Sequence, residues 1–442
     1  MKKIGGDNMI KTIGIRREDK NEWERRVPLV PGDVLELGDK YGIKTIIQPS
    51  KIRIFSDEEY RKVGAEINEN LKPADAIFAI KEIPPQVLEH GKTYLFFSHT
   101  IKGQPYNMTM LKRLMELECN LIDYELIVGR KDNRLITFSR YAGFAGLIET
   151  LHAFGRKMDL NGYATPFAEI KQAYQYDSLE EAKNHIRKIG AMISENGIPK
   201  ELSPLTVGFL GYGNVSKGAQ EVFDLLPFKT VPADQLEQTI DKIAADNHCL
   251  FKIVFKEEDI VKPLSGTFNL QNYYDHPERF SSVFHNYLPN LKILINCIFW
   301  TEKYPRFVTK ENLKKSLPLI QKSGIKVIGD ISCDINGSIE ITKEGTMPDK
   351  ACYTYDAEND NFVDGIKDNG ITVMAIDNLP CEFSREASSS FSSELKSFVS
   401  DIITADFRED YNEIKLPYEI KKAIILYNGR LTEEYEYMNQ FL

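Results

Sequence analysis

Short apolar runs recur along the chain, and most of them end at a polar or charged residue. Residues 75–81 (DAIFAIK) and 93–98 (TYLFFS) are nearly continuous apolar segments. Such runs are typical of strands that are buried on both faces of a parallel sheet. Segments with helical spacing lie between the runs, for example at residues 108–118. The alternation predicts an α/β fold with mostly parallel sheets.

Length and a break in the pattern predict two domains. The chain has 442 residues, and single hydrophobic cores stop growing at about 250–300 residues. A second series of strands begins at Leu205–Leu210, directly after a proline-bounded break at residues 199–204. It continues with strands expected at residues 293–296, 326–329 and 371–375. Long helices are expected at residues 142–158, 174–195 and 391–403, and the last of these would return the chain to the first domain.

Composition excludes several classes of function. With 65 acidic and 56 basic residues the net charge is −9, which disfavours nucleic-acid binding. No apolar run approaches the roughly 18 residues of a membrane span, and the first residues lack a signal core, so a cytoplasmic protein is expected. The six cysteines form no CxxC pair, which favours buried thiols in a reducing compartment. The seven histidines show no zinc-type spacing, so no metal is expected.

A glycine-rich turn follows the strand at residues 205–210. Gly211 would allow a tight turn, and Gly213 would let the backbone approach a pyrophosphate. The helix expected next begins with Asn214, Val215 and Ser216, whose amide groups and dipole attract phosphate. The third glycine of the GxGxxG pattern is replaced by Ser216, and Gly218 follows two residues later. The context predicts a dinucleotide site, and an ordinary strand–helix turn is the alternative.

The choice between NAD and NADP depends on the strand that follows. NAD-selective folds place an acidic residue near the end of that strand, about 20 residues after the turn. Residues 228–231 are expected to form it, but Pro232 follows and the first acid, Asp234, comes late. The pattern favours NADP slightly, with NAD as the alternative.

Titratable residues follow several of the strands expected in the first domain. Lys81 and Glu82 come after one strand, His99 after the next, and Glu125 after a third. Ligands collect at the carboxyl ends of parallel strands, and lysine and histidine can act as acid or base. Arg26 could bind a carboxylate. The alternatives are a solvated strand end for Lys81, a turn cap for His99 and a surface charge cluster around Arg26.

Eight segments together resemble the lysine-ketoglutarate reductase family, which is the saccharopine-forming half of a bifunctional enzyme. More distantly the chain is similar to lysine-forming saccharopine dehydrogenases and alanine dehydrogenases. The segments run in order along the chain: residues 23–29 (WERRVPL), 97–102 (FSHTIK), 121–125 (LIDYE), 141–146 (YAGFAG), 211–220 (GYGNVSKGAQ), 276–280 (HPERF), 330–334 (DISCD) and 376–380 (IDNLP).

The resemblance implies a role for each candidate residue. Lys81 and His99 would be the acid–base pair, with Glu82 and Glu125 tuning their pKa values. Substrate binding would involve Arg26, Gln104 and Arg134. Asp330 and Asp334 would lie where the cofactor domain borders the substrate cleft. The resemblance also implies a discontinuous substrate domain, residues 1–140 plus 383–442, with a Rossmann-type dinucleotide domain at residues 141–382, as in alanine dehydrogenase.

The implied reaction is the NADPH-dependent condensation of L-lysine with 2-oxoglutarate to saccharopine. The chain ends at Leu442, which leaves no room for the fused dehydrogenase half, so another protein would oxidise saccharopine. The expected partners are these small molecules, and a homo-oligomer is compatible with the sequence. The alternatives are an NAD-dependent, lysine-forming saccharopine dehydrogenase, another opine-type amino-acid dehydrogenase, and a cofactor-binding regulator without turnover.

Overall fold

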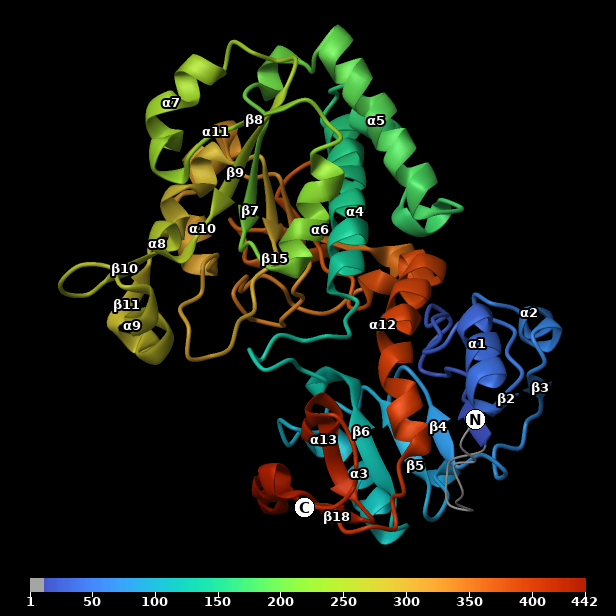
Figure 1. Cartoon of the computed structure of the whole chain (residues 1–442). Coiled ribbons are helices and arrows are strands. Elements are labelled where there is room, and N and C mark those ends of the chain that lie inside the picture. Colours follow the sequence, from blue (N-terminus) through green and yellow to red (C-terminus); the bar gives the residue numbers. More distant parts are fainter. Residues whose placement is uncertain (1–11) are drawn as a thin grey trace. The chain divides into compact units, whose positions relative to one another are not determined.

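The computed structural model describes residues 12–442, and these form two units (Figure 1). Unit 1 combines the described residues up to Phe138 with Ser384–Leu442. Unit 2 is the continuous segment Ser139–Phe383. The substrate-side candidates therefore lie in unit 1 and the glycine turn in unit 2.

Unit 1 is built on an eight-stranded sheet with the strand order β18-β17-β6-β5-β4-β1-β2-β3. The strands from β6 to β3 pair in parallel, and β17 and β18 extend the sheet antiparallel. The bounds are β1 Thr12–Ile15, β2 Lys44–Ile47, β3 Glu66–Ile67, β4 Ala76–Phe78, β5 Thr93–Phe96, β6 Asn120–Asp123, β17 Ile424–Tyr427 and β18 Arg430–Leu431.

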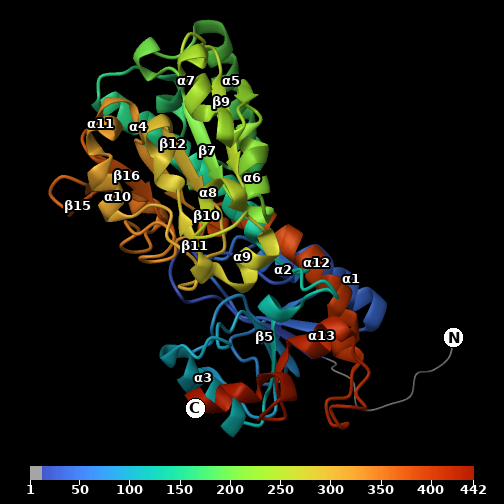
Figure 2. The ribbon, with the colours of Figure 1, turned by 90° about the vertical axis from the view of Figure 1, so that its left-hand side faces the viewer.

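Helix α12 ties the two chain segments of unit 1 together. The helices of this unit are α1 Pro31–Tyr41, α2 Asp57–Lys62, α3 Pro105–Glu116, α12 Ser384–Thr404 and α13 Tyr418–Ala423. Helix α12 runs beside α1 in both views (Figures 1 and 2). The Lys396 ammonium lies 2.8 Å from an Asp33 carboxylate oxygen, and the Ser388 hydroxyl accepts a hydrogen bond from the Val27 amide at 3.0 Å. The long helix expected at residues 391–403 is thus confirmed, with an earlier start.

Unit 2 contains a second eight-stranded sheet with the order β15-β14-β16-β13-β12-β7-β9-β8. The strands from β16 to β8 are parallel, and β14 and β15 are antiparallel. The bounds are β7 Thr206–Leu210, β8 Phe228–Thr230, β9 Leu250–Phe255, β12 Ile293–Asn296, β13 Val327–Asp330, β14 Cys352–Asp356, β15 Asn361–Asp364 and β16 Ile371–Met374, with a separate hairpin formed by β10 Val261–Pro263 and β11 Phe280–Ser282.

Helices cover this sheet, and two of them approach each other closely. Helices α4 and α6 lie side by side (Figure 1). A Cβ at Gly143 would lie 2.0 Å from the Val215 carbonyl oxygen, and one at Gly218 would lie 2.2 Å from that of Arg140. The helices of unit 2 are α4 Ser139–Leu160, α5 Leu179–Asn196, α6 Asn214–Phe223, α7 Leu236–Ile243, α8 Glu257–Ile260, α9 Leu270–Asp275, α10 Lys310–Lys315 and α11 Leu317–Ser323. Both sheets are mostly parallel, which confirms the predicted α/β class.

The expected helix at residues 174–195 starts later than the charge pattern indicated. Ser178 is its N-cap, and the Ser178 hydroxyl accepts a hydrogen bond from the Glu181 amide. Across residues 12–442 the structure contains no helix that is both long and apolar enough to cross a membrane.

Candidate functional site

Four adjacent strands of unit 1 end at one edge of its sheet. The order β6-β5-β4-β1 places the residues that follow these strands side by side, because parallel strands share a carboxyl edge. Lys81 and Glu82 follow β4, His99 follows β5, and Glu125 follows β6. The structure therefore brings these four predicted residues to a single edge.

His99 and Glu82 form a hydrogen-bonded pair at this edge. The Nδ1 atom of His99 lies 2.6 Å from Oε1 of Glu82. His99 has a φ of 49°, a left-handed conformation that is uncommon for residues other than glycine. The Asn107 side-chain amide donates a hydrogen bond to the His99 carbonyl at 3.0 Å. The strained backbone and these two contacts fix the direction of the imidazole ring.

Glu82 is ionised at neutral pH despite its partial burial. Burial by itself would raise the pKa of Glu82, but the hydrogen bond and charge of His99 outweigh it and lower the pKa to about 2. The Lys20 ammonium, 3.5 Å from Oε2, contributes in the same direction. The anionic carboxylate holds Nδ1–H of His99, so Nε2 is the atom that can exchange a proton with a ligand.

Glu18 is a residue that the sequence reasoning missed. It follows β1 and is buried, and its carboxylate accepts hydrogen bonds from the amides of Ile80 at 2.7 Å and Lys81 at 3.0 Å. Burial, followed by the charge of Glu24, raises the pKa of Glu18 to about 7. Glu18 therefore fixes the backbone that carries the half-buried Lys81. The local sequence around Glu18, IRRED at residues 15–19, gave no signal for this role, because the contact spans 62 residues.

Arg26 is buried and bound to a carboxylate of the chain itself. Its Nε lies 2.8 Å from Oε1 of Glu24, and its Nη2 lies 2.6 Å from Oε2. The guanidinium also lies over the Phe138 ring at 4.1 Å. Phe138 lies near Phe97, whose ring in turn stacks with His99. Aromatic contacts thus link Arg26 to the neighbourhood of His99, while Glu24 fixes its orientation.

The other predicted substrate residues lie in loops next to this edge. Gln104 is the N-cap of α3, five residues beyond His99. Arg134 forms an ion pair with Glu125, and its side chain is about half exposed. Each of the two candidate arginines therefore has a glutamate partner in this structure.

In unit 2 the glycine turn has the geometry of a phosphate cradle. Gly211 has a φ of 88°, which requires glycine in practice. Gly213 is the N-cap of α6, and a Cβ added there would meet nothing within 4 Å. The turn and the amides of Asn214 and Val215 fit a dinucleotide pyrophosphate. The Ser216 side chain is buried and accepts a hydrogen bond from Gln220, so only its backbone can serve that ligand.

The strand order corrects one expectation. The sequence suggested that residues 228–231 lie beside the glycine strand, but β9 pairs with β7, and β8 lies outside β9. The strand that ends beside the glycine turn is therefore β9, where Glu257 follows Phe255 and Lys256. Glu257 accepts a hydrogen bond at 3.0 Å from the hydroxyl of Tyr212, which belongs to the glycine turn. The sequence did not point to Glu257, because the segment that contains β8 and α7 separates β9 from the glycine turn along the chain.

Asp330 and Asp334 follow β13 at the carboxyl edge of the unit 2 sheet. Asp330 is buried and accepts hydrogen bonds from Asn296 at 2.8 Å and Thr342 at 2.5 Å. Burial raises the pKa of Asp330 to about 6, although both of these hydrogen bonds oppose the rise. Asp334 is half-buried. Asp330 thus organises the loop that carries Asp334.

The fold is that of alanine dehydrogenase. Residues 14–145 match the family model described as alanine dehydrogenase/PNT, N-terminal domain. The solved structure of an L-alanine dehydrogenase superposes with a TM-score of 0.60 at 14% identity, covering 98% of this chain and 100% of that chain.

Proteins with similar sequences identify the family more narrowly than the fold does, and they confirm the resemblance to the saccharopine-forming enzymes. The chain is 36% identical to the alpha-aminoadipic semialdehyde synthase of Arabidopsis thaliana, over 99% of this chain and 42% of the relative. The chain thus spans less than half the length of that protein. It is also 24% identical to the lysine-forming, NAD(+) saccharopine dehydrogenase of Neurospora crassa, over 88% of this chain and 90% of the relative.

Proposed function

We propose that this chain is an oxidoreductase that condenses L-lysine with 2-oxoglutarate and reduces the product to saccharopine. The proposal is supported by its similarity to alpha-aminoadipic semialdehyde synthase over nearly its whole length. Similarity to a saccharopine dehydrogenase supports the same chemistry.

One observation carries the proposal: the His99–Glu82 pair beside Lys81 at the carboxyl edge of the unit 1 sheet. Imine formation needs a base for the attacking amine and an acid for the ketone oxygen. A histidine whose Nδ1 is held by a carboxylate can donate or accept a proton through Nε2. Lys81 follows the neighbouring strand, and it is the second proton-transfer group besides His99.

The neutral ε-amine attacks the ketone carbon and a C–N bond forms as the C=O π bond opens onto oxygen. The oxygen then takes a proton and the nitrogen loses one, which gives a neutral carbinolamine. A second proton on that oxygen lets it leave as water, and the nitrogen lone pair forms the iminium. Lys81 and His99 supply and accept these protons.

Arg26 and Arg134 supply positive charge for the carboxylates of the two substrates. The chain as a whole has a net charge of −9 and cannot attract these carboxylates through its overall field.

The glycine turn of unit 2 would hold the cofactor. Gly211, Gly213 and the first amides of α6 would bind its pyrophosphate, and Glu257, which accepts a hydrogen bond from Tyr212 of the glycine turn, would contact the adenosine ribose. When bound, a nicotinamide dinucleotide supplies the hydride that reduces the iminium carbon. The family resemblance implies NADPH as this cofactor.

Glu257 favours the NAD-dependent alternative. A carboxylate at the end of the strand beside the glycine turn suits a ribose diol and repels a 2′-phosphate. An NAD-dependent, lysine-forming saccharopine dehydrogenase would run the same steps in reverse, with the same proton-transfer residues.

The deciding experiment is a cofactor-oxidation assay with the purified chain. L-lysine plus 2-oxoglutarate should oxidise the reduced cofactor and yield saccharopine by mass spectrometry, with NADPH and NADH tested in parallel. Ornithine plus 2-oxoglutarate, and alanine plus pyruvate with ammonia, serve as competing substrates. Turnover with one of these pairs alone would contradict the proposal. Cofactor binding by calorimetry without turnover on any pair would favour a regulatory protein instead.

A further inference from the structure

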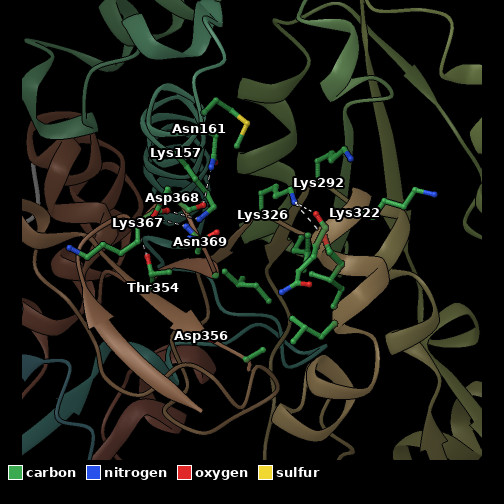
Figure 3. A pocket seen from close by; sticks show the side chains of 18 of the residues that line it. Lys157, Asn161, Lys292, Lys322, Lys326, Thr354, Asp356, Lys367, Asp368 and Asn369 are labelled. Atoms are coloured by element: carbon green, nitrogen blue, oxygen red, sulfur yellow. Dashed lines mark hydrogen bonds between the residues drawn. The ribbon is translucent and has the colours of Figure 1, made fainter. Parts of the chain in front are cut away.

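Unit 2 contains a pocket at the opposite edge of its sheet from the glycine turn. The pocket has a volume of about 750 Å³. Lys292 directly precedes β12, Lys326 directly precedes β13, and both line the pocket together with Lys157 from the last turn of α4. Figure 3 shows Lys157 on one side of the pocket, and Lys292 and Lys326 on the other. Three cations from separate elements therefore converge on one cavity.

Two of these lysines are strongly buried. The exposed fraction is 1% for Lys157 and 7% for Lys292, and Lys326 is half-buried. Their protein contacts are neutral oxygens. Lys157 donates to the Lys367 carbonyl at 2.8 Å, Lys292 donates to the Ser323 carbonyl, and Lys326 donates to the carbonyls of Ile320 and Gln321 at 3.4 and 3.3 Å.

In the described part of the chain, these three ammonium groups form no ion pair with a carboxylate. Among the ion pairs of residues 12–442, none includes Lys157, Lys292 or Lys326. The acidic residues that line the pocket are exposed or half-buried: Glu201, Asp356, Glu358 and Asp368. Asp356 accepts hydrogen bonds from the Glu358 amide and the Asn359 side chain, and Asp368 accepts one from the Asn369 amide. Buried charges in proteins are normally paired, so the interior of this pocket has unbalanced positive charge.

The lysines also repel one another. Burial, followed by the charge of Lys326, lowers the pKa of Lys157 and that of Lys292 to about 8. Asp368 opposes this effect at Lys157 only. An anion placed among the three ammonium groups would relieve both the repulsion and the lack of a counter-ion.

We propose that this pocket is a second ligand site, which binds a small phosphate-bearing molecule. Lysine binds phosphate as a point charge, whereas paired recognition of carboxylates favours arginine, and arginine is absent from the residues that line this pocket. Asn161, Thr354 and Asn369 add polar groups around the lysines. The four-residue strand β12 separates the two edges of the sheet by about 13 Å, so the pocket is separate from the dinucleotide turn.

The test is calorimetric titration of the full-length chain with pyrophosphate at pH 7, with citrate as the polycarboxylate comparison. We expect one saturable pyrophosphate site that binds at least tenfold more tightly than citrate and weakens with added salt. Prior saturation with NADPH should leave this affinity unchanged. Competition by NADPH would place the anion at the glycine turn and overturn the proposal, and stronger binding of citrate would overturn the phosphate assignment.

Variants locate the site. Lys326→Met should weaken pyrophosphate binding at least tenfold, while Lys242→Met, which changes an exposed lysine of α7 outside the pocket, should leave it unchanged. Equal binding by the two variants would overturn the proposal.

A second experiment, lysine acylation of the unaltered chain, tests the proposal even if Lys326→Met does not fold. Pyrophosphate should protect Lys326, but not Lys242, from acylation at pH 8 by at least fivefold, and absence of protection would equally overturn the proposal.

Discussion

At the scale of single residues, the unit 1 site is defined by contacts between segments far apart in the sequence. Glu82 and His99 are 17 positions apart and meet at 2.6 Å. Glu18 reaches the amides after β4 from the end of β1. The residue types were visible in the sequence, but the role of Glu18 depends on the strand order, which places β1 beside β4.

The acid–base assignment predicts large losses of turnover. His99→Gln and Lys81→Met should each lower kcat by roughly 10²- to 10⁴-fold, because each removes a proton-transfer group. Steady-state kinetics with lysine and 2-oxoglutarate measures the effect. Lys20→Met is the control, since its ammonium only contacts Glu82 at 3.5 Å, and it should lose less than tenfold. Near-normal kcat in both His99→Gln and Lys81→Met would remove these residues from the mechanism.

Cofactor selectivity gives a second prediction for a single residue. Glu257→Gln removes a negative charge beside the glycine turn and keeps a hydrogen-bonding side chain. The ratio of kcat/KM for NADPH to that for NADH should rise about tenfold, because charge repulsion of the 2′-phosphate is lost. Glu258→Gln, at the exposed neighbouring position, should leave the ratio unchanged. An unchanged ratio in Glu257→Gln would place cofactor selection elsewhere.

The buried lysines of unit 2 predict a stability effect at alkaline pH. The pKa of Lys157 is lowered from 10.5 to about 8, mainly by burial. Between these pH values the unfolded state binds more protons, so stability should rise with pH from about 8 to about 10.5. Urea unfolding should show that the original chain gains stability relative to Lys157→Met across this range. A constant difference between the two proteins would contradict the lowered pKa.

At the scale of elements, helix packing explains the glycines of unit 2. The sequence contained two glycines of the dinucleotide pattern and a displaced third, Gly218. The structure shows that Gly218 faces α4 and that Gly143 faces α6, each within contact distance of the other helix's backbone. The small residues at the start of α4 thus have a packing role, and they fix α6 behind the glycine turn.

Gly143→Ala tests this packing. The added Cβ would lie 2.0 Å from the Val215 carbonyl and 2.6 Å from the Ala219 amide nitrogen, so α6 must move. We expect a loss of about 1–3 kcal/mol in the free energy of unfolding and weaker dinucleotide binding. Gly32→Ala in α1 is the control, because nothing lies within 4 Å of its added Cβ, and it should be neutral or slightly stabilising. Similar stability of both variants would contradict the close helix contact.

At the scale of the whole molecule, one unit is continuous and the other is assembled from two separate segments. Unit 2, Ser139–Phe383, has its own eight-stranded sheet. Unit 1 needs α12 and the strands β17 and β18 from the C-terminal segment.

This difference predicts how fragments behave. Residues 139–383 expressed alone should unfold cooperatively in circular dichroism and retain dinucleotide binding. Residues 12–138 alone should not, because the buried faces of α1 and β6 would lose α12 and β17. A fragment 139–383 without a cooperative transition would contradict the independence of unit 2.

The sequence by itself determined the α/β class, the glycine turn and the residue types of the candidate site, because apolar periodicity and turn chemistry are local properties. The strand at residues 293–296 was located to the residue for the same reason. Only the tertiary structure decided that β9, and not β8, lies beside β7, that Glu24 pairs with Arg26, and that three lysines share a pocket. These features depend on which strands and helices become neighbours, and that choice is made by packing between segments far apart in the chain.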